Sequence, residues 1–91
     1  MEYQVGMLVE SRAGHDKGTL YIITGKDKDY VYLCDGQLRT VDRPKRKKRM
    51  HIAKKSAVPD QIMQKLIEQK PVSNEDIKRV IKIWRSENVK G

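Results

Sequence analysis

Short runs of β-branched, aromatic and aliphatic residues, separated by glycine-containing turns, fill the first half of the chain. This pattern is typical of strands, and four such runs cover residues 7–12, 19–24, 30–34 and 37–41. A fifth run, 50–53, has the alternation of a closing strand. In 30–34 the apolar Val31 and Leu33 alternate with tyrosines, so one face of that strand is expected to be buried. Four or five short strands in about fifty residues predict a small, strongly bent barrel.

The dipeptide Asp35-Gly36 is the strongest hairpin signal in the chain. It predicts a type I′ turn that leads directly into the strand at 37–41. Pro44 then ends that strand or places it at a sheet edge, because proline cannot donate to a ladder.

After Ser56 the apolar residues recur at helical spacing. The first predicted helix covers roughly residues 60–69, with an apolar face of Ile62, Met63, Leu66 and Ile67. Ser73 and Asp76 resemble a capping box, and the second helix that they open carries a stripe of Ile77, Val80, Ile81 and Trp84. Two short amphipathic helices are expected to form an antiparallel hairpin that packs on itself and on the barrel. The sequence therefore predicts an α+β fold, with a barrel over 1–55 and a helical hairpin over 56–91.

Charge is distributed unevenly along the 91 residues, which carry a formal net charge of +8. Residues 1–42 hold five Lys/Arg against seven Asp/Glu, and residues 56–91 hold seven against five. Residues 43–55, the basic segment, hold eight Lys/Arg and no acid, so they account for the whole excess. A cationic patch of this density indicates an anionic partner. Counterion release from a nucleic acid supplies much of the free energy of such contacts.

The basic segment supplies the residues that we expect to touch nucleic-acid phosphates: Arg43, Lys45, Arg46, Lys47, Lys48, Arg49, Lys54 and Lys55. They cannot all face one backbone, because successive strand residues point to opposite faces. If about five of them touch phosphates, the logarithm of the binding constant should fall with the logarithm of salt concentration, with a slope of about −3.5 to −4.5. The alternative is an unstructured targeting or solubility segment.

The sequence Gly14-His15-Asp16-Lys17-Gly18 lies between two predicted hydrophobic strands. This Gly-x-x-Lys-Gly arrangement resembles the KOW motif of ribosomal proteins and transcription elongation factors. The basic segment that follows is similar to that of the archaeal and eukaryotic large-subunit ribosomal proteins of the fourteen-e type and their small bacterial relatives. The resemblance covers roughly residues 5–55, and it implies an SH3-like β-barrel that binds RNA. Tyr21 stands where many members have a further glycine, which weakens the likeness to elongation factors.

The loop and the tyrosines add further candidate contacts. His15 and Lys17, at the tip of the loop, are expected to donate to phosphate or ribose, with a solvated loop as the alternative. Three aromatic residues are candidates for stacking on unpaired bases, namely Tyr21, Tyr30 and Tyr32. Packing inside a barrel that lacks phenylalanine is the alternative for them.

Other classes of protein are disfavoured by the same sequence. Cys34 is the only cysteine, so neither an internal disulfide nor a zinc site with His15 and His51 is expected. We expect no cofactor, no catalytic residue and no enzymatic activity, since paired carboxylates, an activated nucleophile and a phosphate-cradling loop are missing. We do not expect the first residues to act as a signal peptide, and no stretch approaches the roughly 20 apolar residues of a spanning helix. A cytoplasmic protein without membrane contact is expected.

The expected function is a non-enzymatic module that grips structured RNA, with ribosomal RNA or the ribosome as its partner. An adaptor that docks on another protein through the C-terminal helices is one alternative. A DNA-binding or transcription-associated module is another, since charge alone does not separate RNA from DNA.

Overall fold

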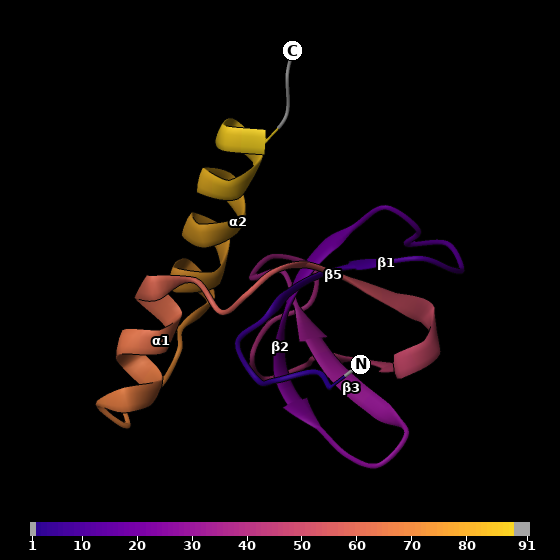
Figure 1. Cartoon of the computed structure of the whole chain (residues 1–91), viewed down its shortest axis with the longest axis horizontal. Coiled ribbons are helices and arrows are strands. Elements are labelled where there is room, and N and C mark those ends of the chain that lie inside the picture. The colour runs from indigo at the N-terminus through magenta and orange to yellow at the C-terminus, as the bar shows by residue number, and fades with distance from the viewer. Residues whose placement is uncertain (1, 89–91) are drawn as a thin grey trace.

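The structure is a computed structural model that describes residues 2–88, and its strands form one antiparallel sheet (Figure 1). The strands are β1 (Leu8–Ser11), β2 (Leu20–Lys26), β3 (Tyr30–Cys34), β4 (Lys45–Lys48) and β5 (Ile52–Ser56). Their order across the sheet is β4-β3-β2-β1-β5, so β4 and β5 are the edges and the sheet is not closed. A 3₁₀ turn, η1 (Arg49–His51), joins the two edge strands directly. The helices α1 (Asp60–Ile67) and α2 (Asn74–Asn88) follow, which gives an α+β fold.

Both faces of the sheet are buried, because apolar residues occupy successive positions of the central strands. One face packs around a cluster of Tyr3, Met7, Val9, Tyr21, Ile23, Val31, Leu33 and Ile52. The alternate residues point the other way, where Leu8, Leu20, Ile22 and Cys34 meet Ile62 of α1 and Ile77, Val80 and Ile81 of α2. The helices therefore complete the second core, and the sheet residues beneath them would be exposed to water without them.

The two helices cover one face of the sheet, and the contact between them is small (Figure 1). The expected capping box is confirmed, because the Ser73 amide donates to Asp76 Oδ2 at 2.9 Å and the Asp76 amide donates to Ser73 Oγ at 3.1 Å. The first of these bonds, together with Lys65 Nζ at 2.9 Å, lowers the pKa of Asp76 to about 2. Within residues 2–88, no helix combines the length and the apolar composition that crossing a membrane requires.

The prediction of a strand at 37–41, entered through a type I′ hairpin, is wrong. Asp35 Oδ1 accepts the amides of Gln37 and Arg39 at 2.9 Å each, so this backbone is satisfied within its own loop. The amide of Val41 donates instead to Asn74 Oδ1 at the start of α2, at 2.9 Å. The segment is thus a loop that holds the helix, and β3 pairs with β4 in its place.

The closing strand is also shifted relative to the prediction. Residues 49–51 form the η1 turn, and β5 runs from Ile52 to Ser56, where it pairs with β1. The basic segment is therefore neither a tail nor a linker, because residues 45–48 form an edge strand. Lysine is common on sheet edges, since its charge discourages pairing with another chain.

Candidate nucleic-acid interface

The alternation of β4 divides its four cations between two environments. β4 pairs with β3 in a register that sets Tyr30 opposite Lys48 and Tyr32 opposite Arg46. Lys45 and Lys47 are partly covered, and the Lys47 side chain is only 10% exposed. Arg46 and Lys48 point the other way and are exposed. Only the second pair has its charge open to a ligand.

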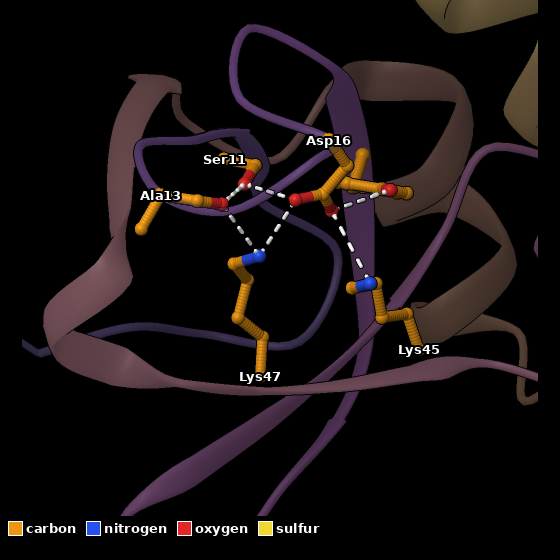
Figure 2. Close-up of polar contacts among 6 residues, drawn as sticks. Ser11, Ala13, Asp16, Lys45 and Lys47 are labelled. Atoms are coloured by element: carbon orange, nitrogen blue, oxygen red, sulfur yellow. Dashed lines mark hydrogen bonds and ion pairs between the residues drawn. The ribbon is translucent and has the colours of Figure 1, made fainter.

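The covered lysines converge on Asp16, which comes from the loop between β1 and β2 (Figure 2). Lys47 Nζ donates to Asp16 Oδ1 at 2.7 Å and to the carbonyl oxygen of Ala13 at 3.0 Å. Lys45 Nζ lies 3.8 Å from Asp16 Oδ2. Two hydroxyls complete the network, since Ser11 Oγ and Tyr21 Oη each donate to the carboxylate at 2.8 Å.

Burial by itself would raise the pKa of Asp16, but the hydrogen bonds from Lys47, Ser11 and Tyr21 outweigh it. The pKa of this carboxyl is therefore held well below its ordinary value. Burial and the same bond raise the pKa of the Tyr21 hydroxyl above its usual range. Asp16 thus stays ionised and fastens the loop to β4.

Asp16 is the functional-site residue that the sequence reading missed. His15 and Lys17 on either side of it were predicted to contact nucleic acid, whereas Asp16 was assigned no role. A carboxylate in a loop that precedes eight cations without an acid of their own is a signal for such a pairing. The sequence does not say which of those cations takes it.

Two further cations of the basic segment, Arg49 and the exposed Lys55, also pair with other groups of the chain. Arg49 Nη2 donates to the carbonyl oxygen of Asp27 at 3.1 Å, and its backbone amide donates to the carbonyl oxygen of Asp29 at 3.0 Å. Lys55 Nζ lies 3.5 Å from Glu10 Oε1. The role of Arg49 is therefore to tie η1 to the turn between β2 and β3.

Four cations of the segment form no ion pair within residues 2–88: Arg43, Arg46, Lys48 and Lys54. All four are exposed. The Arg46 guanidinium lies over the ring of Tyr30, with 3.5 Å between its central carbon and the ring centroid. This stacking holds the guanidinium in place while its edges stay in water.

The loop from β1 to β2 presents His15 and Lys17 to solvent. Gly14 and Gly18 bracket them with φ angles of +81° and +93°, a conformation that glycine adopts without strain. Asp16 lies between them and points inward, so the loop is rigid at its base and open at its tip.

The three tyrosines have three different environments. Tyr21 is 3% exposed and bonded to Asp16, so it cannot stack on a base, and that expectation is corrected. Tyr32 is half-buried, and its hydroxyl donates to Asp27 Oδ2 at 3.1 Å. Tyr30 is half-buried beside the exposed cations and borders two surface hollows, of about 430 and 390 Å³. Of the three, Tyr30 is the ring on which an exposed cation stacks.

Among residues 2–88, no three His, Cys, Asp or Glu side chains gather closely enough to hold a metal ion. Cys34 is buried, and its thiol donates to the carbonyl oxygen of Thr40 at 3.2 Å. Burial raises the pKa of this thiol, which keeps it protonated. The residues that the structure does bring together are the exposed Arg46 and Lys48 of β4, Gly14 at the start of the loop, and Tyr30. Searches of the chain against protein-family models and against curated proteins find no match.

Proposed function

We propose that this chain is a non-enzymatic RNA-binding module that grips the sugar-phosphate backbone of structured RNA. The site lies on the outer side of β4, continues over the 14–18 loop and reaches Lys54 on β5. The proposed partner is ribosomal RNA or the ribosome, in the manner of the KOW proteins that the loop resembles. In this proposal the open five-stranded sheet is an SH3-like barrel of the KOW type.

The observation that carries the proposal is the separation of structural from available cations. Within the basic segment, Lys45, Lys47, Arg49 and Lys55 already have partners inside the fold. Arg46 and Lys48 on β4, Lys54 on β5, and Arg43 in the turn before β4 remain available. The backbone that carries these cations is already folded, and the Arg46 guanidinium rests on Tyr30, so less conformational entropy is lost on binding than from an unstructured segment.

The test is a salt titration of binding to ribosomal RNA. The four available cations contribute about 0.7–0.9 each to the slope of log K against log salt. The variant in which Arg43, Arg46, Lys48 and Lys54 are all replaced by glutamine should therefore lose about 3 units of slope. The matched control removes four charges from α2 and the connection before it, at Lys70, Arg79, Lys82 and Arg85, and should lose less than about 1 unit.

Two results would contradict the proposal. One is an affinity of the wild-type protein that does not change with salt. The other is an equal loss of slope in the two variants, which would indicate nonspecific attraction to net charge.

Exposed apolar residues on α1 favour a second candidate, an adaptor that docks on a protein. Ile67 is 70% exposed, while Met63 and Leu66 are 39% and 36% exposed on the same helix. Deleting residues 57–91 would not test this cleanly, because Ile62 and the buried stripe of α2 complete the second core. The exposed Ile67 and Met63 should instead be changed to serine in the full chain. Loss of recruitment in the cell with unchanged RNA binding would assign the helices to a protein partner.

Binding to DNA is separated from binding to RNA by competition. Duplex DNA and structured RNA of equal length present similar phosphate charge but different groove shapes. At matched salt concentration, RNA should displace DNA from the protein well before DNA displaces RNA.

A further inference from the structure

Met50 stands at the apex of η1 with 77% of its surface exposed, between β4 and β5. Its neighbours at the surface are charged residues and one tyrosine. It borders a hollow of about 390 Å³ whose other walls are Asp29, Tyr30, Lys48 and Arg49. That volume lies at the lower end of the range for small-ligand sites, about 300–1,000 Å³. The hollow therefore has room for one small planar group, with an apolar contact and two cations at its rim.

The turn that carries Met50 is held from both sides. The amide of Arg49 donates to the carbonyl oxygen of Asp29 at 3.0 Å, and the amide of Arg12 donates to the carbonyl oxygen of His51 at 2.7 Å. Arg49 Nη2 adds a bond to the carbonyl oxygen of Asp27. Met50 is thus exposed on an ordered backbone, and binding to it would not require the turn to fold first.

Tyr30 and Lys48 border both this hollow and a second, shallower one. The second hollow, of about 430 Å³, is lined by Tyr30 and Lys48 again, together with Gly14, Arg46 and His51. Arg46, which stacks on the ring, borders only this second hollow. Tyr30 therefore carries a stacked cation and lines the first hollow together with Met50.

We propose that the hollow between Tyr30 and Met50 receives the base of one unpaired nucleotide in an RNA strand. The base stacks on the tyrosine ring and against the methionine thioether, while Lys48 contacts the adjoining phosphate. Unpaired bases of RNA commonly stack on aromatic side chains, and apolar side chains such as methionine pack against bases where stacking is interrupted. The inference rests on the proposed function and adds that the preferred RNA contains a bulge or loop next to a helix.

The test compares an RNA stem carrying one bulged 2-aminopurine, a fluorescent analogue of adenine, with the same stem fully paired. Stacking of a base on an aromatic side chain corresponds to roughly 5- to 150-fold in affinity. The wild-type protein should therefore bind the bulged stem at least about fivefold more tightly and quench the emission of the 2-aminopurine.

Two variants test the walls of the hollow, and one serves as the control. Met50→Gln and Tyr30→Leu should each bring the preference for the bulge to within about twofold and abolish the quenching. Leu38→Gln is the matched control, because Leu38 is 88% exposed and borders neither hollow. It should keep both the preference and the quenching. Thermal melting of Met50→Gln should match wild type, since the side chain is mostly in water.

The outcomes separate this inference from the proposed function. Equal, salt-dependent binding of both stems by wild type would overturn the inference and leave the proposed function standing. Absence of binding to either stem would overturn both. Competition by adenosine monophosphate at the concentration at which the bulged stem competes would also overturn the inference, because it would assign the hollow to a free nucleotide.

Discussion

Replacing Asp16 by asparagine should destabilise the protein strongly, although the residue lies in a surface loop. The change keeps the size of the side chain and removes its charge. Lys47, with its side chain 10% exposed, would then lack the carboxylate at 2.7 Å that neutralises it. The hydroxyls of Ser11 and Tyr21 would also lose a charged acceptor.

The magnitude follows from the burial of the pair. A hydrogen bond to a charged group contributes about 1.5–3 kcal/mol, and removing one partner of a fully buried ion pair costs about 3–5 kcal/mol. The Asp16 side chain is 15% exposed, so water can replace part of the interaction. We therefore expect a loss of about 2–3 kcal/mol. That is a large part of the stability of a small domain, which is about 5 kcal/mol.

Urea unfolding measures this directly. With a slope of about 1 kcal/mol per molar urea, the midpoint should fall by about 2–3 M. Asp42→Asn is the control, because Asp42 is exposed and makes no side-chain hydrogen bond or ion pair within residues 2–88. Its midpoint should stay within about 0.5 M of wild type.

Acid provides a second measurement on the same pair. Since the pKa of Asp16 is depressed in the folded state, its contribution is complete above the unfolded pKa of about 3.9 and is lost as the pH falls towards the folded value. The gap in unfolding free energy between wild type and Asp16→Asn should therefore be constant from pH 7 to 5 and should narrow below pH 4. A gap that is absent at pH 7, or that does not narrow in acid, would refute the reasoning.

Three further predictions concern the lysines of β4, two glycines with positive φ and the cap of α2. Lys47→Gln should cost about 1–3 kcal/mol and leave the salt slope of RNA binding unchanged, while Lys48→Gln should lower that slope by about 0.7–0.9 and leave the urea midpoint unchanged. If Lys47→Gln lowered the salt slope and Lys48→Gln lowered the stability, the assignment of the two lysines would be refuted. Gly36→Ala should lower the melting temperature more than Gly18→Ala: both have positive φ, but a Cβ at Gly36 would lie 2.5 Å from the Asn74 carbonyl oxygen, whereas Gly18 has open space. Equal shifts in melting temperature would show that backbone strain at positive φ, and not the contact with α2, sets the loss of stability. Ser73→Ala should remove about 1 kcal/mol by calorimetry, because the capping bond to the Asp76 amide is lost, and no change would mean that the cap is redundant.

Local signals in the sequence were sufficient for most of the secondary structure. The alternation of Val31 and Leu33 with tyrosines predicted which face of β3 is buried, since side chains alternate along any strand. Ser73 and Asp76 predicted the start of α2, because a capping box is formed entirely by residues that are near in sequence. The concentration of charge in 43–55 likewise needed no structure to be recognised.

The prediction of a hairpin at Asp35 was wrong because the backbone amides that follow it find other hydrogen-bond acceptors. The Asp35 carboxylate satisfies the following amides locally, and Asn74, 33 residues from Val41, accepts the next one. Once 37–41 is held by α2, the edge of β3 is left open, and the basic segment pairs with it. The order of apolar and polar residues does not indicate that β3 pairs with the basic segment and not with residues 37–41.

Sequence alone determined that the protein has a dense cationic segment after a strand-rich half, and that two amphipathic helices follow. Only the tertiary structure decided which of those cations a ligand can reach. The register of β4 turns Lys45 and Lys47 inward, and the loop brings Asp16 to Lys47 across 31 residues of sequence. Neutralisation of a charge depends on distances in space of a few ångströms, because the Coulomb energy falls with separation and is screened by water beyond contact. Residue order does not fix those distances until the chain is folded.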